Sequence, residues 1–479
     1  MLAFRTADRV ISNPRFALGP MLVWCSTRAV VCSCGLIVSE SRGETPMSKG
    51  LRARESKQES VPRGKPLTKL DELLKWIAVV SAGVALSTGL DARTAFAHQE
   101  PAQQLEEIGT VRQIYDGTLY PDIQVRTFRN IERLFPTRTV RRGTHVHSLS
   151  QSEAPLKGVE FSSAGKKYDM YDYMSLNRVS GLLILKDGKI AFERYELGNN
   201  ETTRWMSMSV VKSITSTLVG VAIKDGHIKS IDDPVTKYLP TLAGSAYEGV
   251  TIRNLLQMAS GVKWDEAYTN PVSDRRRMLE LQLSGNPGSI LQLMSRLARA
   301  GGPGTIWNYN TGETHVVGEL IHAAVKRPVA QYLSERIWSK FGMESDATWW
   351  LESSNGQEIG GSGLSATLRD YGRFGLFVMN HGFVGGEQIL PEGWLSEAGT
   401  SKIIGGKKVN YGYMWWIPDA SANPVHEGAF LARGIFGQSI YINPAANVVV
   451  VVWSARPKPT GTDTISDEDF YAAVVRALQ

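Results

Sequence analysis

The chain is organised around Arg204-Trp-Met-Ser-Met-Ser209-Val-Val-Lys212-Ser-Ile-Thr-Ser-Thr-Leu-Val-Gly-Val-Ala-Ile223. Apolar residues recur in this stretch at helical spacing, densely enough that most of the helix surface should be buried. Ser209 stands just before the periodicity begins, at or near the N-cap, and Lys212 follows one turn later on the same face. We therefore expect a central helix that begins at a serine and places a lysine beside it.

A serine hydroxyl is a poor nucleophile at neutral pH unless a base removes its proton. A desolvated lysine with a lowered pKa can be that base. Ser209 and Lys212 have the spacing of such a Ser-x-x-Lys pair. The tetrapeptide by itself more often marks an ordinary N-cap followed by a lysine whose head group reaches solvent. Other parts of the chain must therefore distinguish a catalytic pair from an ordinary helix start.

Composition sets broad limits on the function. The 479 residues are 42% hydrophobic, which is enough for a large core, and the formal net charge is +6. Residues 1–97 hold 14 Lys+Arg and 8 Asp+Glu, which leaves 39 of each in the remainder. The chain after residue 97 is thus neutral and gives no reason to expect a nucleic-acid partner. All three cysteines lie in the first 46 residues, so neither a disulfide framework nor a thiol nucleophile is expected further on.

Residues 1–97 are interpreted as a leader. From Met47 a basic region precedes the apolar run Trp76–Leu90 and the small-x-small site Ala95-Phe-Ala97, an order typical of a secretory signal peptide. We expect a signal peptide over 47–97, cleavage after Ala97, and an exported protein, periplasmic or secreted, with no stable membrane span. The alternative is a membrane anchor, but the apolar run is shorter than the ~20 residues that a spanning helix needs. Residues 1–46 fit neither scheme, and Met47 is a candidate start.

The remaining chain predicts an α+β fold. Residues 98–157 are polar and are expected to form an N-terminal arm, followed by one domain over 158–479. Strands 182–185 and 190–195, joined by Asp187-Gly188, form the clearest hairpin, and strands 437–443 and 448–453 close the domain. Helical patterns dominate between them, including an expected helix over 289–299 and the run Arg275-Arg-Arg277, interpreted as a solvated face. We predict an antiparallel β-sheet flanked by helices, with an inserted all-helical subdomain over about 206–355.

With these parts placed, residues 160–479 resemble the serine β-lactamase and DD-peptidase superfamily, in particular its branch with class C β-lactamases, related esterases and 6-aminohexanoate-dimer hydrolase. Ser209-Val-Val-Lys212 resembles the first family motif, and Tyr309-Asn310-Thr311 stands where the second motif, Tyr-x-Asn, would fall. Ala432-Arg433-Gly434 occupies the place of the third motif, Lys-Thr-Gly, of which it keeps only the glycine.

The resemblance implies that Lys212 and Tyr309 deprotonate Ser209, which attacks a carbonyl and forms an acyl-enzyme. Tyr309 would need a phenol pKa lowered from ~10, or would relay a proton. It also implies an oxyanion site formed by the main-chain N–H groups of Ser209 and Ile435. Gly434 would let substrate approach the strand backbone.

Two departures from the family pattern concern the substrate. Thr311 and Ala432 replace the asparagine and lysine that hold a β-lactam, so carboxylate binding would depend on Arg433, whose side chain should point to the opposite strand face. We therefore expect an esterase or amidase acting on a small or linear substrate rather than a true β-lactamase. A penicillin-binding or sensor domain without turnover is the alternative.

Other candidate groups are assigned less weight. Glu313 and His315 follow Tyr309 and suggest a Ser-His-acid triad, but ordinary helix residues are the preferred interpretation. Trp205, Trp307, Tyr411 and Trp415 are candidates for lining a cleft or for core packing. The scattered histidines and the lack of a phosphate-binding glycine loop predict neither metal nor cofactor. The oligomeric state is left open.

Overall fold

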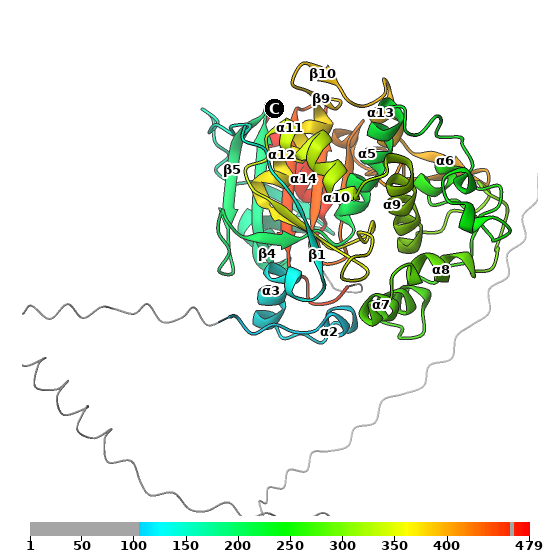
Figure 1. Ribbon diagram of the computed structural model, residues 1–479. Helices are drawn as coiled ribbons and strands as arrows, with labels where there is room; N and C mark the ends of the chain where they lie inside the picture. Colours follow the sequence, from blue (N-terminus) through cyan, green and yellow to red (C-terminus); the bar gives the residue numbers. More distant parts are fainter. Residues whose placement is uncertain (1–104, 460–463) are drawn as a thin grey trace, which may run out of the picture. The chain divides into compact units, whose positions relative to one another are not determined.

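The computed structural model describes residues 105–459 and 464–479 (Figure 1). The expected leader, its cleavage site and the three cysteines lie outside the described residues, so export stays a prediction. In the described part of the chain, no helix combines the length and apolarity needed to cross a membrane.

The main sheet is antiparallel throughout and has the strand order β13-β14-β15-β4-β5. Every residue of β15 is buried, which fits its continuous run of apolar residues from Val448 to Trp453. The strands run over Phe430–Arg433 (β13), Ser439–Asn443 (β14), Val448–Ser454 (β15), Val179–Lys186 (β4) and Lys189–Tyr195 (β5).

The predicted hairpin is confirmed as β4 and β5. Its turn residues Asp187 and Gly188 have φ of 50° and 75°. Two successive positive φ angles are what a two-residue type I′ turn requires, because its twist matches that of the flanking strands.

Helices cover both faces of this sheet (Figure 1). Helix α12 (Leu368–Met379) packs on one face, where Gly372 and Gly375 allow its backbone to approach Leu183 and Val449 closely. Helices α4 (Met170–Leu176) and α14 (Asp467–Ala477) pack on the other face. The α+β prediction is confirmed.

A second antiparallel sheet, of order β1-β7-β8-β6, joins distant parts of the sequence. Strand β1 comes from the expected arm, and β6 leads directly into the helix that begins after Ser209. The strands are Thr137–Val140 (β1), Ala347–Trp350 (β7), Leu364–Thr367 (β8) and Arg204–Met206 (β6). The short pairs are Glu160–Ser163 with Lys166–Asp169 (β2, β3), Phe383–Val384 with Glu387–Gln388 (β9, β10) and Lys402–Ile404 with Lys407–Val409 (β11, β12).

Helices dominate the chain between β6 and β7. They are α5 (Val210–Lys224), α6 (Ile252–Leu256), α7 (Asp274–Ser284), α8 (Ser289–Ser295), α9 (Thr311–Val325), α10 (Val329–Leu333) and α11 (Ser339–Phe341), with a π-helical turn at Ser334–Trp338 and 3₁₀ turns at Val235–Lys237 and Pro240–Leu242. Helix α8 ends four residues before the expected boundary at Arg299. A short helix α13 (Trp394–Ala398) and a 3₁₀ turn at Pro424–His426 follow later.

The arm packs through helices α2 (Val111–Asp116) and α3 (Pro121–Arg129) and a 3₁₀ turn at Ile131–Arg133. The interpretation of the arginine run as a solvated face is wrong for two of its three members, because Arg275 and Arg276 are each only 4% exposed. The Arg275 guanidinium lies over the Tyr115 ring, 4.4 Å from its centroid, and Arg276 pairs with Asp116 at 2.6 Å. Arginine can be buried here because α2 supplies an aromatic face and a carboxylate.

Candidate active site

Ser209 lies at the junction between β6 and α5. The pairing of β6 with β8 continues to Ser207, whose N–H donates to the Leu364 carbonyl at 2.7 Å. Met208 then takes a φ of 42°, a left-handed conformation that a long side chain rarely adopts. Ser209 is the N-cap residue of α5, as predicted, but its hydroxyl caps no main-chain N–H of the described chain. The hydroxyl is therefore available to another partner.

That partner is Lys212. Its Nζ donates to the Ser209 Oγ at 2.9 Å and to the Gly361 carbonyl at 2.8 Å. The lysine is 1% exposed. Burial lowers the pKa of Lys212 to about 7, while the Glu266 carboxylate opposes this shift and the Arg275 guanidinium adds to it. A large fraction of Lys212 is thus neutral near pH 7 and able to accept a proton.

Tyr309 lies beside the lysine, with Lys212 Nζ 5.3 Å from its ring centroid. Burial and the Glu266 charge raise the pKa of Tyr309, and the Ser209 hydroxyl opposes them only in part. The first of the two alternatives for Tyr309, a phenol with a lowered pKa, is therefore not supported. Tyr309 remains a protonated phenol that can relay a proton.

Sequence reasoning missed Glu266. Its carboxylate accepts hydrogen bonds from the Thr311 N–H at 2.9 Å, from the Thr311 hydroxyl and from the Trp264 indole. It raises the pKa values of both Lys212 and Tyr309. A single glutamate in the loop after α6 carries no motif, and only its place beside the lysine distinguishes it.

Thr311, which occupies the place of the substrate-binding asparagine in the family motif, is 2% exposed and begins α9. Its methyl group faces Gly361, where an added Cβ would lie 2.9 Å from Thr311 Cγ2 and 3.2 Å from Lys212 Nζ. The absence of a side chain at Gly361 thus leaves room for the side chains of Lys212 and Thr311. The threonine hydroxyl is directed to Glu266.

The turn after β13 lies against the residues that precede Ser209. An added Cβ on Gly434 would lie 2.9 Å from the Ser207 carbonyl oxygen and 3.1 Å from the Met208 Cβ. This contact within the protein by itself requires the absence of a side chain at Gly434. Among the described residues, neither the Ser209 N–H nor the Ile435 N–H donates to a main-chain carbonyl.

Arg433 does not join this group. Its guanidinium pairs with Glu468 of α14 at 3.1 Å, whereas Ala432 packs into the core on the α5 side of the sheet. The predicted alternation of β13 is confirmed, and it removes Arg433 from the Ser209 face. A role for Arg433 in holding a substrate carboxylate has no geometric support.

Aromatic side chains form a wall beside Tyr309. Its ring stacks on Trp416 at 5.4 Å, and Tyr411 contacts both rings edge-on at 6.0 and 4.9 Å. Trp307 lies 5.8 Å from Tyr411. Tyr309, Trp307 and Trp416 are partly exposed, while Trp205, Tyr411 and Trp415 are buried.

Glu313 and His315 do not form a triad with Ser209. The Glu313 carboxylate accepts hydrogen bonds from Ser260 and Asn310, and burial raises its pKa to about 8. His315 faces Glu319 and Glu352 at 3.7 and 3.6 Å. The preference for helix residues over a triad agrees with this placement.

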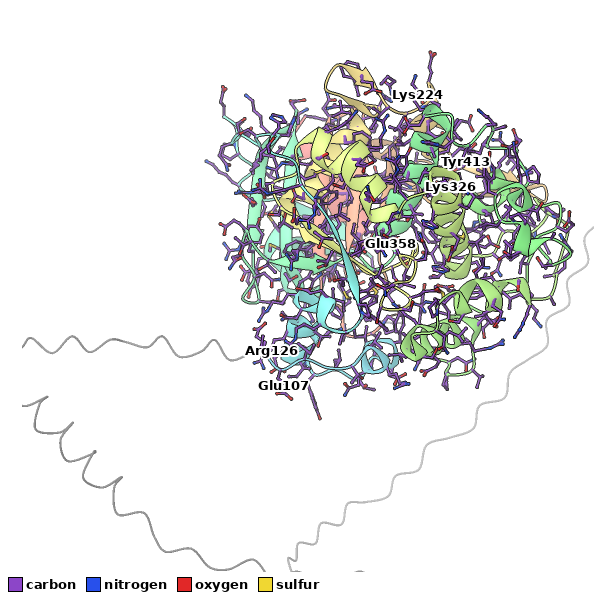
Figure 2. The ribbon with its side chains drawn as sticks, in the orientation of Figure 1. Glu107, Arg126, Lys224, Lys326, Glu358 and Tyr413 are labelled. Atoms are coloured by element: carbon purple, nitrogen blue, oxygen red, sulfur yellow. The ribbon has the colours of Figure 1, made fainter. Side chains whose placement is uncertain are left out.

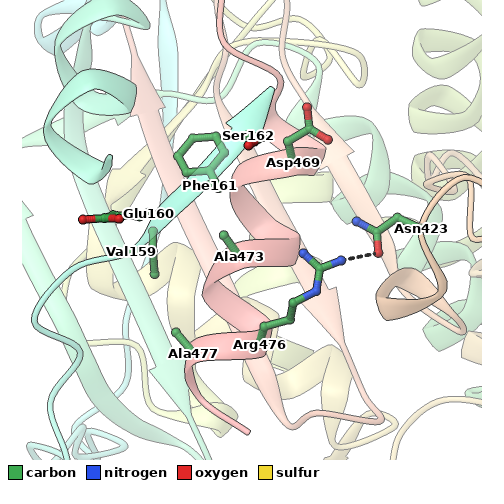
Figure 3. Close-up of a pocket in the computed structure, with 9 residues that line it drawn as sticks. All are labelled: Val159, Glu160, Phe161, Ser162, Asn423, Asp469, Ala473, Arg476 and Ala477. Atoms are coloured by element: carbon green, nitrogen blue, oxygen red, sulfur yellow. Dashed lines mark hydrogen bonds between the residues drawn. The ribbon is translucent and has the colours of Figure 1, made fainter. Parts of the chain in front are cut away.

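Figure 3 shows a separate pocket between β2 and α14, in which Arg476 donates to Asn423 at 2.9 Å. Its described lining residues include none of Ser209, Lys212 and Tyr309. This pocket therefore lies apart from Ser209.

Known proteins resemble this chain in sequence or in fold. The chain is 28% identical over 351 residues to 6-aminohexanoate-dimer hydrolase of Paenarthrobacter ureafaciens, with 69% of this chain and 85% of that protein covered. A candidate 6-aminohexanoate-dimer hydrolase of Bacillus anthracis superposes with a TM-score of 0.64 at 23% identity, covering 74% of this chain and 92% of that one. EstCE1, a hydrolase with promiscuous acyltransferase activity, superposes with a TM-score of 0.50 at 17% identity, covering 64% and 96%.

The resemblance that the motifs suggested is confirmed at the level of the superfamily. The sequence profile of the beta-lactamase family matches residues 177–473, a span that contains Ser209, Lys212, Tyr309 and Gly434. The chain belongs to the beta-lactamase family and is a hydrolase of the serine beta-lactamase-like kind.

Proposed function

We propose that this protein cleaves an ester or amide bond of a small or linear substrate through an acyl-enzyme on Ser209. The observation that carries the proposal is the 2.9 Å contact between the Ser209 hydroxyl and a buried Lys212 whose pKa is about 7. A lysine in this state can take the hydroxyl proton near neutral pH, which makes it the general base.

In the proposed reaction, neutral Lys212 accepts the proton as Ser209 Oγ bonds to the substrate carbonyl carbon. The carbonyl electron pair moves to oxygen, and the N–H groups of Ser209 and Ile435 are the candidates to stabilise it. Collapse of this intermediate breaks the bond to the leaving alcohol or amine, which receives the proton from Tyr309 while Lys212 reprotonates the tyrosine. Water, deprotonated by the same groups, then cleaves the acyl ester and releases the acid.

The aromatic wall supports an apolar or extended acyl chain as substrate, because Tyr309 and Trp416 offer flat apolar surface next to the nucleophile. With Arg433 on the opposite face of the sheet, a carboxylate-dependent β-lactam fits less well. The name of the Paenarthrobacter relative makes a linear 6-aminohexanoate dimer the first amide to test.

The test measures the full chain and its Ser209→Ala and Lys212→Met variants with p-nitrophenyl acetate and with the linear 6-aminohexanoate dimer. Product release is followed together with intact mass. Sustained release that is lost in Ser209→Ala, and lowered about 100-fold to 10,000-fold in Lys212→Met, is the expected result. A stable acyl adduct on Ser209 without turnover would instead identify the penicillin-binding or sensor alternative. Unchanged release in Lys212→Met would overturn the role of the lysine.

A further inference from the structure

A cluster of three metal-ligating side chains lies behind the Ser209 site and takes no part in the proposed reaction. His315 and Glu319 stand four residues apart on α9, so they share one helix face. Glu352 reaches them from the segment that follows β7. One ligand atom from each residue lies within 4.8 Å of the other two. We propose that His315, Glu319 and Glu352 bind a divalent transition-metal ion, for which Zn²⁺ is the best match.

The two distances from His315 to the carboxylates are close to those expected around such an ion. His315 Nε2 lies 3.7 Å from Glu319 Oε1 and 3.6 Å from Glu352 Oε2. Bonds of about 2.0–2.2 Å at tetrahedral angles separate two ligand atoms by about 3.3–3.6 Å. The imidazole and two carboxylates are ligands that Zn²⁺ accepts, and the two negative charges balance a divalent cation.

Polar atoms of this cluster lack hydrogen-bond partners, as expected for a metal site without its ion. Among residues 105–459 and 464–479, both ring nitrogens of His315 and the Oε2 of Glu352 are buried without a hydrogen-bond partner. The His315 and Glu352 side chains are 0% and 2% exposed. Buried polar atoms are normally paired, and an ion would supply the missing partner of His315 Nε2 and Glu352 Oε2, while His315 Nδ1 would not contact it. The Glu319 side chain is 15% exposed and leaves an open side for entry.

The surroundings orient these ligands. The second oxygen of Glu352 accepts a hydrogen bond from the Gly288 N–H, which turns Oε2 toward His315. Glu358, labelled in Figure 2, follows in the same segment, and its carboxylate is already engaged by Arg138 and by the Ala330 N–H. Glu358 is therefore not a fourth ligand. In metal sites, hydrogen bonds such as the one from Gly288 to Glu352 hold the metal-binding side chains in place.

The position of the cluster connects it to Lys212. The segment that begins at Glu352 continues to Gly360 and Gly361, whose carbonyls accept from Thr215 Oγ1 and Lys212 Nζ, each at 2.8 Å. An ion held by α9 and Glu352 would fasten this segment to the helix. The ion would thus have a structural role, because it would hold the segment whose Gly361 carbonyl accepts from Lys212. Its binding can be measured without an assay of hydrolysis.

The test uses the full chain without an affinity tag, stripped with a chelator and with its three cysteines alkylated, so that Cys25, Cys32 and Cys34 do not take up metal. Zn²⁺ alone is added at pH 7.5, and bound metal and thermal unfolding are measured. The expected result is one equivalent of Zn²⁺ and a higher Tm, with no such effect of Mg²⁺ at the same concentration.

Glu319→Gln is the informative variant because this side chain is partly exposed and the substitution keeps its size. We expect it to weaken Zn²⁺ binding by at least about tenfold. Glu335→Gln, which changes a carboxylate outside the cluster, is the matched control and should bind as the wild type does. Glu352→Gln repeats the test if the first variant does not fold. Wild-type protein that takes up no Zn²⁺, or Glu319→Gln that binds as tightly as wild type, would overturn the proposal and leave His315 as an imidazolium between two carboxylates.

Discussion

Gly434, in the turn after β13, lies so close to Met208, directly before Ser209, that an added Cβ would be 3.1 Å from the Met208 Cβ. Met208 is itself held at a φ of 42°. The edge of the main sheet and the start of α5 are therefore in close contact at Met208, the residue directly before Ser209. Strain of this kind persists only where surrounding contacts maintain it.

Gly434→Ala should lower both stability and activity. The new Cβ would lie 2.6 Å from Gln438 Oε1 and 2.9 Å from the Ser207 carbonyl, so the turn must move away from Ser209. We expect a loss of about 1–3 kcal/mol in the free energy of unfolding, measured by urea denaturation, and a lower kcat. Gly158→Ala is the control, because its Cβ would meet nothing within 4 Å. Equal effects of the two substitutions would contradict this account.

Glu266→Gln should shift the pH dependence of hydrolysis. The carboxylate raises the pKa of Lys212, so its neutralisation should lower that pKa below about 7. The base must be neutral to act, and kcat/KM therefore rises with pH through this pKa. We expect the acid limb of the kcat/KM profile to move to lower pH, with Glu280→Gln leaving the limb in place. A limb that stays fixed or moves upward in Glu266→Gln would count against the placement of this charge.

The two ion pairs between α2 and α7 should differ in their contribution to stability. The Arg276 side chain is 5% exposed in its pair with Asp116, whereas the Arg112 and Glu280 side chains are 57% and 46% exposed. Asp116→Asn leaves a buried guanidinium without its charge partner and should cost about 1–3 kcal/mol. Glu280→Gln breaks a solvated pair that water and salt screen, and it should cost clearly less than Asp116→Asn. Urea denaturation of both variants measures the difference, and a larger loss in Glu280→Gln would refute the role of burial.

Glu313→Gln should remove a pH-dependent part of the stability. Burial raises the pKa of Glu313 to about 8 in the folded protein, above its ordinary value of 4.5. Between these values the folded state holds a proton that the unfolded state has released, so this contribution is complete below pH 4.5 and is lost as pH rises through 8. From pH 5 to pH 9 the wild type should therefore lose stability that Glu313→Gln does not lose. The difference in free energy of unfolding should change in favour of the variant. A constant difference across this range would show that Glu313 titrates normally.

The sequence by itself determined the features that depend on neighbours along the chain. Ser209 and Lys212 are one helical turn apart, so their 2.9 Å contact follows from helix geometry once α5 is recognised. The hairpin at Asp187-Gly188 and the buried strand β15 are equally local, because turn residues and apolar runs report their own backbone and burial.

Tertiary structure alone decided how the pair is tuned. Glu266 reaches Thr311 across 45 positions, and Gly361 accepts from Lys212 across 149. Isolated residues of this kind form no pattern, since packing rather than chain order brings them together. The same holds for Arg275 and Arg276, whose charge predicts solvent exposure until α2 covers them. The pKa of Lys212 likewise depends on burial, which the sum of these long-range contacts creates and no local pattern encodes.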